Sequence, residues 1–245
     1  ATFCVCLGYL IVKKQKPNFR FGGKGLRYAG KMLLLGLSPF GLAFSPQFML
    51  IFVNISASAV GGQFALNCFA PVSYAISVVL LLLQGVSDGC QPLVSREFGR
   101  GDVRSAKSVR NMAFAFALAV AAVCMVGMFF VRGSISKVFG ASDEVTAEVG
   151  NILPLFIAGF LFVGFSRIAT AFFYATGNTW RAYIVIYGEP LALLLLLLIL
   201  PNFMGITGTW LSVPLSQAFL AVAALLLILL YDRKQRKRES IVSEI

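Results

Sequence analysis

Long apolar stretches, each sufficient to cross a lipid bilayer, alternate with short polar connections along this sequence. Spanning helices are expected near residues 32–55, 64–88, 112–131, 150–174, 182–200 and 207–231, because a helix needs about 20 apolar residues to cross the hydrocarbon core. A run such as Leu191–Leu200 shows none of the polar–apolar alternation of a β-barrel strand. The pattern therefore predicts an all-α integral membrane protein.

Composition supports lipid as the surrounding solvent. Hydrophobic residues make up 58% of the 245 residues and charged residues only 13%, more apolar surface than a soluble domain could bury. The formal net charge of +11 is concentrated on alternate connections, in the ranges 13–31, 96–110 and 233–238. This distribution follows the positive-inside rule and places these connections and the C-terminus in the cytoplasm, so it argues against nucleic-acid binding.

Four segments are expected from the order of these features. Residues 1–12 are interpreted as the end of a preceding transmembrane helix, because the apolar run there is too short to span. Residues 13–31 mix basic and aromatic side chains and predict a cytoplasmic linker, either interfacial or simply solvated. A six-helix transmembrane lobe over 32–231 and a basic cytoplasmic tail over 232–245 complete the prediction.

Two prolines interrupt the first complete span. Pro39 and Pro46 each follow a serine and lie among small residues. Proline removes an intrahelical hydrogen bond and bends a helix, and such breaks are tolerated in lipid where neighbouring helices or a watery cavity satisfy the freed carbonyls. Pro39 and Pro46 are therefore predicted as a hinge, against the simpler interpretation that proline is common in membrane helices.

Three ionisable residues lie inside the expected spans: Asp88, Arg167 and Glu189. Buried charges in a bilayer cost free energy and normally face protein or water. Their separations from the helix ends place all three at a similar depth. We expect Arg167 to pair with Glu189, with Asp88 close enough to share the guanidinium, either as a gating cluster or as a static ion pair.

Uncharged polar side chains on the first two spans are candidates for a substrate surface. Helix-to-helix hydrogen bonding is the competing explanation for each of them. The candidates are Gln47, Asn54, Asn67, Tyr74 and Gln84.

Catalytic and metal chemistry are not indicated. The chain has no histidine, and four of its five cysteines lie in apolar stretches. Cys4 and Cys6 alone do not supply the clustered ligands of a zinc site, and no nucleophile–base arrangement is present. The sequence predicts no enzyme activity, no metal and no cofactor.

Several motifs resemble the multidrug and toxic compound extrusion (MATE) transporters. The segment Gln84–Leu93, with Phe98–Asp102 and Arg104 after it, resembles the end of the second helix of each MATE lobe and the loop that follows. Leu35–Phe40, Ala175–Thr179 and Gly205–Trp210 resemble the opening of the seventh helix, the turn after the tenth and the entry to the twelfth. The resemblance covers nearly the whole chain, in the family's order.

This resemblance implies the C-terminal half of such a transporter, helices seven to twelve, with an N-terminal lobe missing from the sequence. The intact protein would be an antiporter of the plasma (cytoplasmic) membrane, the inner membrane where a cell has two, that exports drugs or organic cations in exchange for H⁺ or Na⁺. Some family members carry acidic residues at positions that correspond here to Gln47 and Val163. That departure favours a coupling carboxylate in the N-terminal lobe.

Two other functions stay open. A lipid-linked saccharide flippase of the same superfamily would need a more cationic cavity, whereas Arg167 is the one cation predicted inside the bundle. A membrane scaffold or truncated fragment without transport activity is the second alternative.

Overall fold

The computed structural model describes Tyr9 and residues 23–243, and these are divided between two units, 1–37 and 38–245. In the first unit, Gly23–Leu37 is helical and belongs to the start of helix α2 (Gly23–Gly99), so the second half of the expected linker, from Gly23 to Lys31, is helix. Residues 1–8 and 10–22, where the end of a preceding helix and the first half of the linker were expected, lie outside the described residues.

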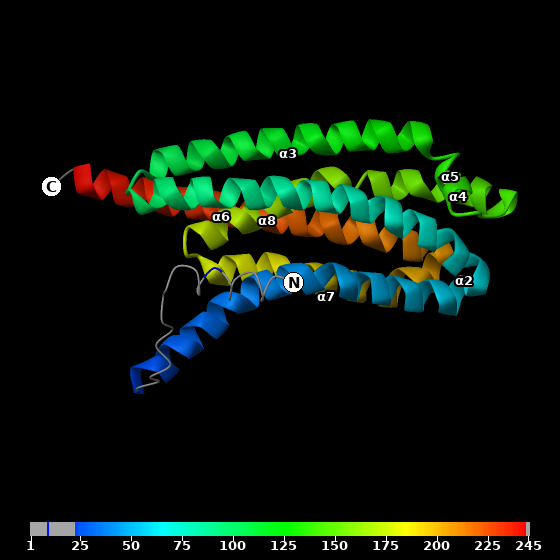
Figure 1. The fold of residues 1–245 in the computed structure, drawn as a ribbon, viewed down its shortest axis with the longest axis horizontal. Helices are drawn as coiled ribbons and strands as arrows, with labels where there is room; N and C mark the ends of the chain where they lie inside the picture. The colour runs from blue at the N-terminus through cyan, green and yellow to red at the C-terminus, as the bar shows by residue number, and fades with distance from the viewer. Residues whose placement is uncertain (1–8, 10–22, 244–245) are drawn as a thin grey trace. The chain divides into compact units, whose positions relative to one another are not determined.

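The second unit is built from helices and contains no strand among the described residues. After α2 the chain forms α3 (Val103–Val131), the short α4 (Ile135–Val138), α5 (Asp143–Ile157), α6 (Phe160–Ala175), α7 (Thr179–Met204) and α8 (Ile206–Ser243). Figure 1 shows α3 and the later part of α2 running alongside each other, with α6, α7 and α8 layered beneath them. The all-α prediction is confirmed.

Four helices in the described part are long and apolar enough to cross a membrane, and α5 with α6 forms a fifth candidate bent by 40°. The first of the four, Ala43–Gly99, has 57 residues. At 1.5 Å per residue it would extend about 86 Å, far beyond a hydrocarbon core of about 30 Å. Two crossings by helix α2 would bring the total to six, and the six-span lobe stays a prediction.

The reversal of α2 lies at Gly62. Its backbone has φ 61° and ψ −153°, a combination that essentially only glycine adopts, and it is the one non-helical residue within α2. Figure 1 shows α2 turning back at the right-hand end of the bundle, near the label α2. We call residues 38–61 the first arm and residues 63–99 the second arm.

Two apolar clusters hold the helices together. One joins the second arm to α5, α6 and α8, and its centre is aromatic: the Phe69 ring stacks on Trp210 with centroids 5.7 Å apart, and Phe156 packs against both. The other joins the end of α2 to α3, α6, α7 and α8. Helix α3 contributes mostly alanines there, and small residues let membrane helices approach closely.

The outer surface is apolar, as lipid requires. Phe130 is 80% exposed and Phe203 83%, and both belong to a large set of exposed aliphatic and aromatic side chains. In a soluble protein an apolar surface of this extent would be an association site. Here it is the surface that a bilayer covers.

The basic connection expected over 96–110 is shorter than predicted. Only Arg100, Gly101 and Asp102 separate α2 from α3. Asp102 caps α3 by accepting hydrogen bonds from the Ser105 backbone N–H at 2.9 Å and from the Ser105 hydroxyl at 2.7 Å. The backbone hydrogen bond from Ser105 lowers the pKa of the Asp102 carboxyl below its ordinary value of 3.8, with a smaller contribution from the hydroxyl.

Candidate functional site

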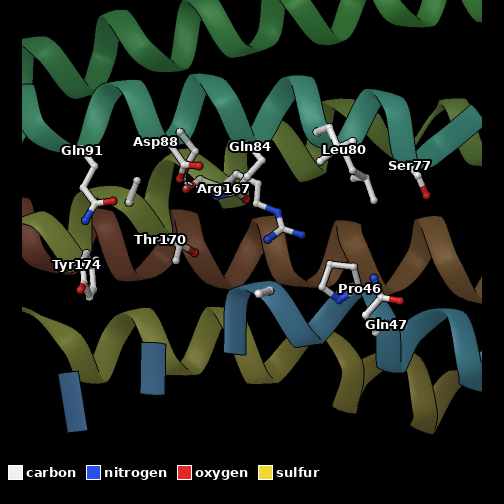
Figure 2. A pocket seen from close by; sticks show the side chains of 14 residues that line it. Pro46, Gln47, Ser77, Leu80, Gln84, Asp88, Gln91, Arg167, Thr170 and Tyr174 are labelled. Atoms are coloured by element: carbon white, nitrogen blue, oxygen red, sulfur yellow. Dashed lines mark hydrogen bonds between the residues drawn. The ribbon is translucent and has the colours of Figure 1, made fainter. Parts of the chain in front are cut away.

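A cavity of about 560 Å³ lies between the two arms of α2 and α6. The first arm contributes Pro46 and Gln47, the second arm contributes one face along its length, and α6 contributes the turns around Thr170. Figure 2 shows side chains from these three segments pointing into a common space. The volume falls within the range of about 300–1,000 Å³ that is usual for small-molecule sites.

The second arm lines the cavity with a polar stripe. Ser77, Gln84, Asp88 and Gln91 recur at intervals of three, four or seven residues, so they share one face of the helix. Gln84 Nε2 donates to Asp88 Oδ1 at 2.7 Å, which holds the carboxylate on this face. Leu80 lies between Ser77 and Gln84 and adds an apolar side chain to this wall of the cavity.

Helix α6 forms the opposite wall with Arg167, Thr170 and Tyr174, again at helical spacing. Arg167 is buried, with 6% of its surface exposed. The Ser87 hydroxyl donates to the Arg167 backbone carbonyl at 3.1 Å and joins the second arm to α6 at this point. The Thr170 hydroxyl donates to the Ser166 carbonyl, so Thr170 keeps acceptor capacity toward the cavity.

Two smaller cavities adjoin this site. One of about 100 Å³ is lined by Arg167, Glu189 and Gln217, and one of about 10 Å³, room for about one water molecule, is lined by Arg167, Glu189 and Ser45 among others. Glu189 is buried on α7, with 9% exposed. Arg167 therefore borders all three cavities, and Glu189 borders the two smaller ones.

Buried oxygen atoms without partners surround the small cavities. Within the described part of the chain, the hydroxyls of Ser45 and Ser166 and Oε1 of Gln217 are buried and make no hydrogen bond. Native proteins rarely leave such atoms unpaired, because each costs free energy unless a water or ligand reaches it. The interior between α2, α6, α7 and α8 is thus polar and built to hold solvent or solute.

The predicted charge cluster is brought together only in part. Asp88 and Arg167 line the same large cavity, and Arg167 and Glu189 line the same two small ones. No ion pair within 4.0 Å joins Arg167 to Glu189 in the described part of the chain, although Arg167 is near enough to attract the Glu189 carboxylate electrostatically, so the expected pairing stays a prediction. Figure 2 shows the Arg167 guanidinium extending toward the large cavity, and Glu189 borders the two small cavities that Arg167 also lines.

The predicted polar candidates divide into two groups. Gln47 and Gln84 line the large cavity. Asn54 donates to the Leu50 carbonyl of its own helix, Asn67 accepts from Gln63, and Tyr74 is exposed and stacks on Phe139 with ring centroids 5.4 Å apart. These three lie outside the three cavities. A role for them in substrate binding stays a prediction.

The proline hinge also stays a prediction. Pro46 borders the cavity, and helical dihedrals continue through both Pro39 and Pro46. The side chain of Pro39 lies outside the described residues. The break in α2 is at Gly62, where the positive φ reverses the chain.

Gln91, Thr170 and Tyr174 line the cavity without having been singled out from the sequence. A signal for Gln91 existed, since it extends the polar stripe by one further helical repeat after Gln84 and Asp88. Thr170 and Tyr174 follow Arg167 at the same spacing on α6. They could have been found by extending the helical face of each intramembrane charge.

The match to known families decides what kind of bundle this is. The MatE family model matches residues 42–198, which include both arms of α2, α3, α6 and most of α7. This chain belongs to the MatE family. The resemblance seen in Gln84–Leu93 and the other motifs is therefore confirmed.

Relatives and solved structures agree with that assignment. The Multidrug export protein MepA of Staphylococcus aureus (strain N315) is 23% identical over 228 residues, which are 91% of this chain and 48% of that protein. Protein DETOXIFICATION 22 of Arabidopsis thaliana is 25% identical over 134 residues, 55% of this chain and 27% of that protein. The chain spans about half the length of the MepA relatives it matches.

The MatE fold is supported by structures of low sequence identity. An outward-facing multidrug resistance MATE transporter aligns with a TM-score of 0.81 at 14% identity, over 95% of this chain and 54% of the other. A transporter of the MOP superfamily from Pyrococcus furiosus, described as having a binding pocket of reverse polarity, aligns with a TM-score of 0.78 at 15% identity, over 91% and 52%. At such identity the likeness shows the fold alone.

Proposed function

We propose that this protein is part of a two-lobe antiporter that binds amphiphilic organic cations in the large cavity and exports them in exchange for H⁺ or Na⁺. The observation that carries the proposal is the polar stripe of Gln84, Asp88 and Gln91 on a membrane-spanning arm, facing 560 Å³ of space. Polar and charged groups inside a bilayer are costly and mark solute pathways. The MepA relatives are multidrug export proteins, which supports the same function.

Asp88 is the residue we assign to the cationic part of the substrate. Its carboxylate is accessible from the cavity and is oriented by Gln84. Leu80, Leu81 and Ala171 provide apolar surface beside it. An amphiphilic cation would place its charge at Asp88 and its ring system on these side chains, with little hydrogen bonding required.

We propose the plasma membrane as the location, with the C-terminus in the cytoplasm. Basic residues gather at one end of the bundle: Arg96 lies in the last turn of the second arm and Arg100 follows it. Arg104 and Lys107 lie in the first turns of α3, and Arg233 follows the apolar part of α8. The positive-inside rule assigns that end to the cytoplasm. Exchange by alternating access would then require the partner lobe expected from the resemblance.

Replacing Asp88 with asparagine is expected to weaken transport of an organic cation. The intact protein, as its gene encodes it, would be reconstituted in liposomes, and ethidium movement measured under a proton gradient and, separately, a sodium gradient. We expect one gradient to drive transport, and the apparent KM of Asp88→Asn to rise about tenfold because a charge-assisted contact is lost.

Asp143→Asn is the matched control, since Asp143 is exposed in the first turn of α5 and lies outside the cavities. It should transport ethidium as the unaltered protein does. Ethidium movement that neither gradient changes would contradict the antiporter, and an unchanged KM in Asp88→Asn would contradict the assigned site.

A further inference from the structure

Arg167 is a buried cation whose hydrogen-bond donors meet no acceptor among the described residues. It lies on α6 with 6% of its surface exposed and borders all three cavities. Figure 2 shows its guanidinium extending from α6 into the space that Pro46 and Gln47 close from the other side. A guanidinium carries five N–H donors in a fixed plane, and in a buried position these groups need acceptors.

Arg110 and Arg181 show what a satisfied guanidinium looks like in this protein. Arg110 donates to both carboxylate oxygens of Asp232, at 3.1 and 3.0 Å. Arg181 donates to Asn178 Oδ1 at 2.7 Å and lies over the Tyr231 ring. The Arg167 side chain makes no such hydrogen bond or ion pair with any residue of the described part.

The neighbouring carboxylates do not fill this need. Asp88 Oδ1 accepts from Gln84, and neither Asp88 nor Glu189 comes within 4.0 Å of the Arg167 nitrogens. The two carboxylates lower the free-energy cost of burying the Arg167 charge, but they do not accept hydrogen bonds from its guanidinium. The free plane of the guanidinium faces the large cavity, so the missing acceptor would come from a solute in that cavity.

The charges that face the cavity favour one class of solute. Asp88 is an anion and Arg167 a cation, and both line the same 560 Å³. A simple organic cation would leave Arg167 without an acceptor, and a simple organic anion would leave Asp88 without a cation. A zwitterion with its opposite charges on a rigid apolar frame satisfies both groups.

We propose that Arg167 binds the carboxylate of a zwitterionic amphiphile whose cationic part faces Asp88. This inference rests on the proposed export function and narrows its substrate class. A carboxylate matches the guanidinium with two parallel hydrogen bonds, and such bidentate pairs add orientation as well as affinity. Thr170 and Tyr174 lie on the same face of α6 as Arg167 and line the same cavity.

A pair of dyes that differ in one group tests this directly. Rhodamine 110 carries a free carboxylate, and rhodamine 123 is its methyl ester with the same ring system. Binding of each dye to the intact protein in lipid nanodiscs would be followed by fluorescence anisotropy. We expect the unaltered protein to bind rhodamine 110 more tightly than rhodamine 123.

Arg167→Gln should weaken binding of rhodamine 110 about tenfold or more, the usual scale for a lost charge-assisted hydrogen bond. Its Kd for rhodamine 123 should stay within about threefold. Arg167→Lys, which keeps the charge but not the planar fork, should bind rhodamine 110 with intermediate affinity. Size-exclusion profiles and melting curves of both variants establish that they are folded before Kd values are compared.

Each other outcome overturns the proposal. Equal losses for the two dyes in Arg167→Gln would assign Arg167 a structural role, and equal affinities in the unaltered protein would remove the carboxylate subsite. Displacement of rhodamine 110 by millimolar pyrophosphate would indicate a phosphate site. Binding of rhodamine 123 without rhodamine 110 would end this inference but keep the proposed function, whereas binding of neither dye would end both.

Discussion

Replacing Asp232 with alanine is expected to destabilise the protein by about 3 kcal/mol, because it leaves a buried guanidinium without a counter-ion. Arg110 on α3 has a side chain only 5% exposed, and Asp232 on α8 meets it with two hydrogen bonds. The Arg110 guanidinium also lies over the Phe172 ring, 4.8 Å from its centroid. This contact fastens α3 to α6 and α8 at the basic end of the bundle.

The apparent unfolding temperature in detergent should fall by several degrees in Asp232→Ala. Lys107→Ala is the matched control, because Lys107 reaches the same carboxylate at 3.8 Å from a less buried position and should change the temperature little. The double variant Arg110→Leu/Asp232→Leu should recover much of the loss, since it removes both charges. An Asp232→Ala protein as stable as the unaltered one would contradict the assigned contact.

Gly208→Val is expected to cost about 2–3 kcal/mol or more, because the first turn of α8 packs directly on the backbone of α7. A Cβ atom at Gly208 would lie 2.5 Å from the Leu200 carbonyl oxygen and 2.9 Å from the Pro201 nitrogen. Backbone atoms cannot move aside as a side chain can. The tight turn at Gly205, with φ 58°, fixes this approach.

Gly127→Val provides the comparison, since Gly127 is helical and a Cβ there meets nothing within 4 Å. Both variants would be purified and their melting curves compared in the same detergent. Gly127→Val should melt close to the unaltered protein, and Gly208→Val far below it or not fold at all. Similar melting of the two variants would show that α7 and α8 can separate at this turn.

The helices could be predicted from the sequence because lipid imposes a simple length requirement. Stretches of about 20 apolar residues identify the spans, and α3, α7 and α8 contain the stretches expected near 112–131, 182–200 and 207–231. The sequence predicted the ends of these helices less well, because polar and basic residues extend each helix beyond its apolar stretch. Arg104 and Lys107, for example, lie in α3 rather than in a connection.

The candidate site was predictable on one helix and not across helices. Gln84 and Asp88 share a face by spacing alone, and Gln91 would have followed by extending that face. The partner of a charge depends on how helices rotate and pack, which apolar periodicity in a uniformly apolar bundle does not specify. Arg110 was grouped with the topological charges although it is buried against Asp232, and Arg167 was paired with Glu189 although the two make no ion pair within 4.0 Å.

Protection of a cavity position from labelling tests the central claim most directly. In the intact protein with its native cysteines replaced, Gln91→Cys would report from the cavity wall, and Asn202→Cys from an exposed position at the end of α7. The rate of reaction with a polar maleimide would be measured with and without saturating ethidium. We expect ethidium to slow labelling of Gln91→Cys at least severalfold and to leave Asn202→Cys unchanged, whereas equal rates at Gln91→Cys would contradict the cavity as the binding site.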